Sequence, residues 1–195
     1  MSFDKIYEKA YNFSKESLKN EKVSNLDHTL RVLKWCERIG MEEKADLEVL
    51  RLAAILHDVA VPKVGRKKHC EESAKMAKNL LAEDLPKDKL EKIIGAISTH
   101  SKFVSGEPKT KEAKILYDAD LLDCIGAIGI VRAVLRAISD GASGNLDEML
   151  DVLKNVQKTF SSKLHFDSAK KIGEERLKFL EGFIKELEME LKGEK

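Results

Sequence analysis

The 195-residue sequence has few cysteines, few prolines, few aromatic residues and almost no net charge. Its three cysteines form no CxxC pair, which argues against a disulfide framework or a zinc knuckle and favours reduced thiols. Basic and acidic side chains number 35 and 34, so no overall field favours nucleic acid as a partner. The sequence also lacks a signal-peptide pattern and any run of roughly 20 apolar residues. We therefore expect a soluble, cytoplasmic protein that binds neither nucleic acid nor membrane.

Hydrophobic residues make up 43% of the chain, enough for one well-buried core, and we expect a single domain over residues 1–195. Apolar residues recur at helical spacing almost throughout, while alternating strand patterns are lacking. The predicted fold class is all-α. The expected helices cover roughly 3–19, 24–39, 42–58, 69–83, 87–101, 111–139, 146–160 and 167–191.

Several of these helices have identifiable ends. Ser24 and Asn25 are candidate caps for the second helix, and Gly40 is a candidate end for it. Pro86 lies near the start of the fifth, and Asp167 is a candidate cap for the last.

The pair His57-Asp58 follows the apolar run 50–56 and is the most informative feature of the sequence. Burying a carboxylate and an imidazole at the end of a core helix costs several kcal/mol unless a partner is present. A divalent metal is such a partner. Since neighbouring side chains on a helix diverge by about 100°, both reach one ion only if the helix ends there. The alternative, a capping aspartate beside a surface histidine, is disfavoured by the preceding apolar residues.

Three further histidines lie on apolar segments. His28 shares a helix face with Val32 and Ile39; alone it would be interpreted as a core histidine bonded to a carbonyl, but the His57-Asp58 pair makes it a candidate ligand. His69 is the first residue of an expected helix. Two interpretations have equal weight: an exposed histidine at a helix start, and a functional residue that points to the core. His100 ends another helix and is aimed at the core.

Three acids interrupt the apolar segment 115–125, namely Asp118, Asp120 and Asp123. Two positions along a helix correspond to about 200° of rotation, so Asp118 and Asp120 face nearly opposite ways and cannot easily share an ion. Asp120 and Asp123 share a face. We expect one acid to be a metal ligand, another to orient a histidine, and at least one to form a structural ion pair.

Two expected loops, 59–68 and 101–110, begin at candidate ligands and should border the site. The first carries Lys63, Arg66, Lys67 and Lys68, and Gly65 lets its chain turn inward. Lys63 and Arg66 lie nearest the candidate ligands and are the candidate phosphate-binding residues if the substrate carries phosphate, because cationic side chains neutralise phosphate oxygens. The alternative is a solvated basic loop.

A distant histidine, a His-Asp pair and a distant aspartate on helices together resemble the HD-domain superfamily of metal-dependent phosphohydrolases. The resemblance is carried by His28, His57, Asp58 and Asp120, where Ala119-Asp120-Leu121-Leu122 matches the family's last motif. It implies that these four residues hold a divalent metal and that Asp118 does not.

The resemblance extends over nearly the whole chain. His69, followed by Ser73-Ala74, and His100 match positions that hold a second metal in some branches of the family. The segment 166–177 resembles small stand-alone members. Some nucleotidase branches of the family carry an acid shortly after the His-Asp pair, where this chain has Val59-Ala60-Val61, so a Glu-assisted mechanism is not implied. The GYP signature of the cyclic-diguanylate branch is also absent, and the resemblance therefore implies no specific substrate.

The implied protein is an HD-type helical bundle that holds one or two divalent ions, drawn from Mn, Fe, Co, Ni, Zn or Mg. It would use metal-activated water to hydrolyse a phosphoric ester or anhydride, with Asp58 as the catalytic acceptor of a proton. The expected substrate is a small phosphorylated molecule, in particular a nucleotide. Two alternatives stay open: a di-iron oxygenase of the HD type, and a non-catalytic binding module that a metal stabilises.

Overall fold

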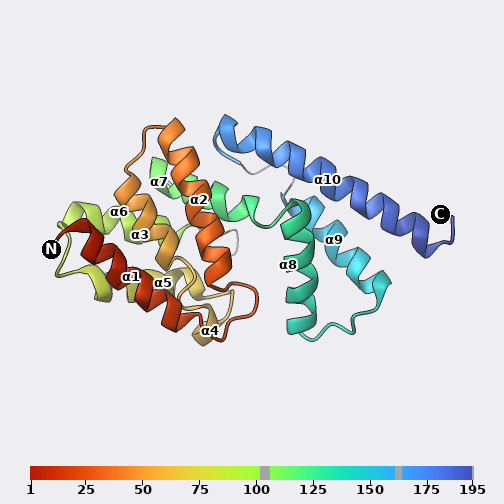
Figure 1. The fold of residues 1–195 in the computed structure, drawn as a ribbon, viewed down its shortest axis with the longest axis horizontal. Helices are drawn as coiled ribbons and strands as arrows, with labels where there is room; N and C mark the ends of the chain where they lie inside the picture. Colours follow the sequence, from red (N-terminus) through yellow and green to blue (C-terminus); the bar gives the residue numbers. More distant parts are fainter. Residues whose placement is uncertain (102–105, 161–163, 195) are drawn as a thin grey trace. The chain divides into compact units, whose positions relative to one another are not determined.

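A computed structural model of the chain describes residues 1–101, 106–160 and 164–194, and these residues form helices and connecting turns without strands (Figure 1). The predicted all-α class is confirmed for this part of the chain. None of the described helices combines the length and the apolar character needed to cross a membrane. The helices are α1 Phe3–Ser17, α2 Leu26–Glu42, α3 Leu47–Leu56, α4 Val61–Val64, α5 His69–Leu81, α6 Lys87–Ser98, α7 Lys111–Leu122, α8 Gly126–Ser139, α9 Leu146–Phe160 and α10 Asp167–Leu191.

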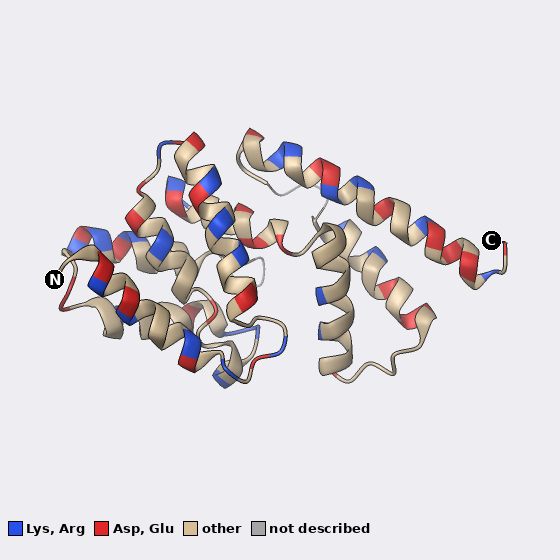
Figure 2. Cartoon of the chain, in the orientation of Figure 1, with Lys and Arg blue, Asp and Glu red and all other residues tan. Residues whose placement is uncertain are grey.

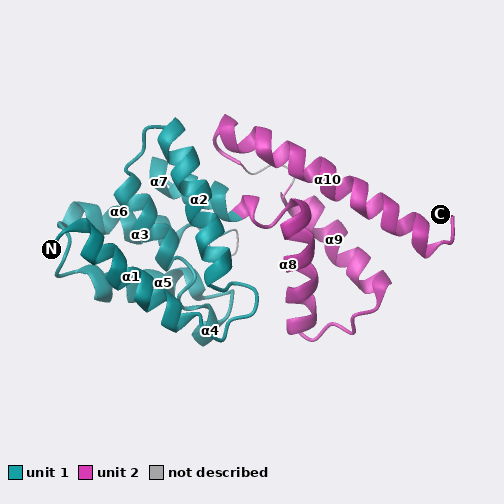
Figure 3. Cartoon of the chain, in the orientation of Figure 1, with its two compact units in different colours: residues 1–120 teal, residues 121–195 magenta. Residues whose placement is uncertain are grey.

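The chain packs as two compact units, residues 1–120 and residues 121–195 (Figure 3). The first contains α1 to α6 and most of α7, and the second contains α8 to α10. Basic and acidic residues are interspersed along the helices of both units (Figure 2). The expectation of a single domain over 1–195 stays a prediction.

Helix α3 is the centre of the first unit, where it contacts α1, α2, α5 and α6. Its sequence, LEVLRLAAIL, is apolar on nearly every side, and such a helix is stable only when neighbours cover it. The Asp46 carboxylate caps its start by accepting the backbone N–H groups of Glu48 and Val49, both at 3.1 Å. Because α3 ends at Leu56, His57 and Asp58 leave the helix at its buried end, as the sequence predicted.

Helix α2 begins where the sequence predicted and continues past its expected end. The Asn25 side chain caps it, with the His28 N–H donating to Asn25 Oδ1 at 3.0 Å. The prediction that Gly40 ends this helix is wrong, because α2 runs to Glu42. A Cβ on Gly40 would lie 2.5 Å from Leu50 Cδ1, so the glycine instead permits close packing of α2 on α3.

The continuous helix predicted over 111–139 is also wrong, because α7 ends at Leu122 and α8 begins at Gly126. Gly126 has φ +74°, a backbone conformation that residues with a Cβ rarely adopt. In the intervening turn, Asp123 forms an ion pair with Arg132 at 2.9 Å. Asp123 therefore takes the structural ion-pair role that was expected of at least one of the three acids.

The second unit is built from α8, α9 and α10, which pack around a small apolar core. The bounds of α9 and α10 agree with the predicted ranges 146–160 and 167–191. The predicted capping role of Asp167 is wrong: Asp167 is the first helical residue, and Phe166 is at the N-cap position. The core consists of Ile130, Leu150, Leu153, Leu180 and Ile184.

Candidate metal centre

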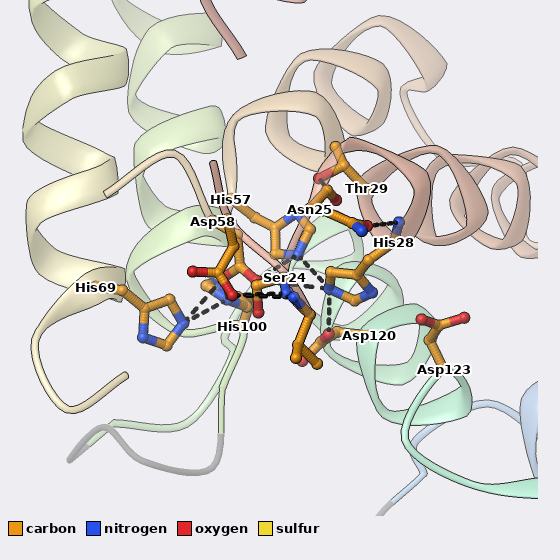
Figure 4. Close-up of polar contacts among 12 residues, drawn as sticks. Ser24, Asn25, His28, Thr29, His57, Asp58, His69, His100, Asp120 and Asp123 are labelled. Atoms are coloured by element: carbon orange, nitrogen blue, oxygen red, sulfur yellow. Dashed lines mark hydrogen bonds and ion pairs between the residues drawn. The ribbon is translucent and has the colours of Figure 1, made fainter. Parts of the chain in front are cut away.

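Six side chains from five segments of the first unit converge on one place (Figure 4). Helices α2, α5 and α7 supply three of them, and the chain directly after α3 and α6 supplies the other three. Five of the six are at most 5% exposed, and the Asp120 side chain is 20% exposed. They are His28, His57, Asp58, His69, His100 and Asp120.

The first group consists of His28, His57, Asp120 and one oxygen of Asp58. His28 Nε2 lies 3.2 Å from His57 Nε2, 3.3 Å from Asp120 Oδ1 and 3.5 Å from Asp58 Oδ2. His57 Nε2 lies 3.6 Å from the same Asp58 oxygen. Atoms bound to one ion at about 2.0–2.2 Å are themselves about 3–3.5 Å apart, so these distances fit a shared metal.

The second group surrounds the other oxygen of Asp58. Asp58 Oδ1 lies 3.2 Å from His69 Nε2 and 3.5 Å from His100 Nε2. The two Nε2 atoms are 3.1 Å apart. Asp58 therefore faces one pair of histidines with each of its two carboxylate oxygens, which is how a carboxylate bridges two metal ions.

Three of the four rings are oriented by the carbonyl three residues earlier in the chain. His57 Nδ1 donates to Ala54 O at 2.7 Å, and the Nδ1 atoms of His69 and His100 donate to the Arg66 and Ile97 carbonyls, each at 2.6 Å. A carbonyl only accepts, so each Nδ1 carries a hydrogen; Nε2 carries a second hydrogen in the protonated ring and presents a lone pair once that proton is lost. Lone pairs that face each other at about 3 Å are unfavourable unless a cation lies between them, which is the chemistry of a metal site.

The ionisation of the site follows from burial and from Asp58. Burial lowers the pKa of His57 to about 4. Burial also opposes the charge on Asp58, yet His57 and the hydrogen bonds from His100, His28 and His69 hold the Asp58 pKa well below its usual range. Burial is the largest single influence on His69 and opposes its protonation, but the hydrogen bonds with Asp58 and Cys70 and the charge of Asp58 together outweigh it and raise the His69 pKa to about 10. An environment that favours a proton beside Asp58 also favours a metal cation there.

The turn that carries His57 and Asp58 is tied to α5. The Ala60 N–H donates to Ser73 Oγ at 3.1 Å, and Ser73 is fully buried. The sequence pattern gave no separate role to Ser73, because a serine on the inner face of a helix is ordinary. Its hydrogen bond fixes where the chain turns after α3 and so where Asp58 lies between the two histidine pairs.

Cys70 is the residue of this site that sequence reasoning missed. The three cysteines form no disulfide, as predicted, and Cys70 Sγ lies 3.3 Å from His69 Nε2 and 3.9 Å from His100 Nε2. Burial would raise the pKa of this thiol, but His100 and His69 bring it down to about 7. Its position directly after a helix-opening histidine was the available signal.

The structure also locates Asp118, the two predicted phosphate-binding residues and the two predicted loops. Asp118 is fully buried on α7 and belongs to none of the convergent ligand groups in the described chain. Lys63 and Arg66 are exposed on the segment that leaves His57-Asp58. That segment is not the plain loop predicted over 59–68, because it contains α4 and then turns at Gly65, with φ +67°. Of the loop predicted over 101–110, residues 102–105 lie outside the described residues.

The two groups predict two metal positions that can be emptied separately. We expect the whole chain, stripped of metal and titrated with Co²⁺, to bind two ions, and His69→Ala to bind one, because His69 contacts only the second group. The matched control is His165→Ala, an exposed histidine of the second unit, which should still bind two. Binding of only one ion by the parent protein, or the same number of ions bound by His69→Ala and the parent, would contradict the prediction of two metal positions.

Comparisons with known proteins identify the family of the chain. The family model described as HD domain matches residues 25–125, a range that contains all six convergent residues. YpgQ of Bacillus subtilis is 31% identical over 172 residues, which cover 85% of this chain and 83% of YpgQ. A crystal structure of YpgQ holds ADP.

Solved structures resemble the chain over nearly all of its length. The Lin1889 protein of Listeria innocua is 28% identical with a TM-score of 0.72, covering 98% of both chains. A predicted HD superfamily hydrolase from an uncultured Thermotogales bacterium is 26% identical with a TM-score of 0.68, covering 94% of this chain and 92% of that one.

Proposed function

This chain belongs to the HD-domain family, and from that premise we propose that it is a metal-dependent phosphohydrolase whose substrate is a small phosphorylated molecule, a nucleotide. The observation that carries the proposal is the position of Asp58 between two pairs of histidine Nε2 atoms. A carboxylate shared between two positions is typical of two-metal hydrolases. The similarity to an HD superfamily hydrolase supports the same reaction class.

The donor set fits divalent metals, and His28, His57, Asp58 and Asp120 would hold the first ion. When bound, such a metal lowers the pKa of water and neutralises charge on phosphate oxygens. His57, with its pKa of about 4, is neutral at pH 7 and therefore offers a lone pair instead of a proton. Asp58 is ionised there, so its carboxylate is the group that can accept a proton from the attacking water.

Two observations support a nucleotide as the substrate. The relative YpgQ was crystallised with ADP, a nucleoside diphosphate. In this chain, the exposed Lys63 and Arg66 lie on the segment between Asp58 and His69, and the Arg66 backbone carbonyl accepts the hydrogen bond that orients the His69 ring. Cations on the segment that joins two candidate ligands can neutralise phosphate oxygens, and a guanidinium can do so with two hydrogen bonds.

The phosphate-binding role of this segment predicts a kinetic effect. Lys63→Ala and Arg66→Ala should each lower kcat/KM for the best nucleotide by about ten-fold or more, the order of one lost charge-assisted contact. Lys75→Ala is the matched control, since Lys75 is an exposed lysine of α5 that pairs with Glu71 at 2.9 Å. If both test variants have the same kcat/KM as the control, Lys63 and Arg66 are surface residues that do not bind the substrate phosphates.

The proposed function is tested by elemental analysis of the purified protein together with a substrate panel. The panel covers nucleoside mono-, di- and triphosphates and cyclic nucleotides, with Mn²⁺ added after chelator treatment. We expect metal-dependent release of phosphate or pyrophosphate from one of these nucleotides. Bound iron with a visible absorption band and no hydrolysis would favour the oxygenase instead. Bound metal without turnover of any kind would favour a binding module.

A further inference from the structure

The second histidine pair has a sulfur atom beside it. Cys70 Sγ lies 3.3 Å from His69 Nε2 and 3.9 Å from His100 Nε2, and Cys70 is fully buried. We propose that Cys70 supplies a thiolate ligand at the second metal position, which makes that position selective for zinc, iron or cobalt over manganese and magnesium. The inference rests on the proposed metal-dependent function and adds the identity of the second ion.

Four donor atoms surround this position. They are Nε2 of His69, Nε2 of His100, Oδ1 of Asp58 and Sγ of Cys70. A zinc ion has Zn–N bonds of about 2.0–2.1 Å and Zn–S bonds of about 2.3 Å, so its ligands lie roughly 3.3–3.7 Å apart in a tetrahedron. The separations of 3.1, 3.2, 3.3, 3.5 and 3.9 Å among these atoms are close to that arrangement.

The histidines show independently that this position is built for a cation. Both rings donate Nδ1–H to a backbone carbonyl, Arg66 O for His69 and Ile97 O for His100. In the neutral rings the two Nε2 atoms therefore face each other as buried lone pairs 3.1 Å apart, and His100 is only 1% exposed. Cys70 is added to a cluster that already needs a positive charge.

Cys36 provides the comparison within the same unit. It is as fully buried as Cys70 and lies on α2, the helix of His28, but it belongs to no convergent ligand group in the described residues. Buried free cysteines usually act as small apolar side chains, and Cys36 fits that description. Cys70 differs because α5 begins at His69, which places the next side chain beside two imidazoles.

The two positions should consequently prefer different metals. The first group offers imidazole nitrogen and carboxylate oxygen, a donor set that also accommodates manganese. Thiolate is a soft donor that favours zinc and iron, whereas magnesium and manganese favour oxygen. We expect a protein with one ion of each kind when both kinds are supplied.

Cobalt absorption tests the sulfur ligand directly. The metal-stripped whole chain is titrated with Co²⁺, and the second equivalent should produce a near-ultraviolet thiolate-to-cobalt charge-transfer band. Cys70→Ser should abolish that band and lower the preference of the second position for Zn²⁺ over Mn²⁺ by about ten-fold or more. Cys36→Ser is the matched control, and both the band and the preference should persist in it.

The outcomes separate this inference from the proposed function. Two bound cobalt ions and nucleotide hydrolysis without a thiolate band would overturn the role of Cys70 and leave the function standing. A band that disappears in Cys36→Ser and not in Cys70→Ser would also overturn it. A band that depends on Cys70 in a protein that hydrolyses nothing on the panel would support the sulfur ligand and count against the function.

Discussion

Asp58→Ala should leave the chain folded but unable to retain metal at either position, with phosphohydrolase activity lowered by about 10³-fold or more. The reason is geometric. Asp58 Oδ2 faces His28 and His57, while Oδ1 faces His69 and His100, so one truncation removes a ligand from both groups. It also removes the negative charge that favours cations between the rings. Elemental analysis after gel filtration and steady-state kinetics measure the two effects.

Two further variants distinguish a bridging role from general damage to the site. Asp58→Asn keeps the size of the side chain and one carbonyl oxygen, so it should retain more metal than Asp58→Ala. His57→Ala should lose the first ion and keep more of the second, since His57 Nε2 belongs to the first group. Full occupancy of both positions in Asp58→Ala, with helicity unchanged by circular dichroism, would show that Asp58 is not shared.

The helical architecture could be predicted because apolar spacing is a local property of the sequence. Helices α9 and α10 have the predicted bounds, and the cap at Asn25 was visible as a residue type. The break between α7 and α8 was missed, since apolar residues continue at helical spacing across it. Only the positive φ of Gly126 and the ion pair of Asp123 with Arg132 show the turn, and both depend on tertiary packing.

The sequence predicted which residues converge at the candidate site, but not that they form two groups around the two oxygens of Asp58. The end of α3 at Leu56 was needed for His57 and Asp58 to face one place, and the polar pair after an apolar run indicated it. The division of the two Asp58 oxygens between two histidine pairs depends on how α5 and α6 pack. Cys70 was missed for the same reason, because its distance from His100 is not encoded in local spacing.

Asp120→Ala should weaken metal binding at the first position by about 100-fold or more, whereas Asp118→Ala should change it by less than about ten-fold. Asp120 Oδ1 lies 3.3 Å from His28 Nε2. Burial opposes the charge on Asp120, but the hydrogen bond from His28 and the charges of the neighbouring histidines together lower the Asp120 pKa, which keeps the carboxylate ionised. Asp118 is about 200° away around α7 and is fully buried. Competition titrations against a metal-binding dye measure the affinities.

Thermal unfolding of the metal-stripped variants provides the second measurement and separates a ligand from a structural acid. Loss of a fully buried carboxylate should lower the Tm of Asp118→Ala without metal present, because the substitution removes the polar interactions that this carboxylate makes inside the fold. Asp120→Ala should have a near-parental Tm in that state, since its carboxylate lies at the partly exposed edge of the site. Added metal should raise the Tm of Asp120→Ala by less than it raises the Tm of the parent. The reverse pattern, with Asp118→Ala losing the first ion and Asp120→Ala retaining it, would exchange the roles of the two acids.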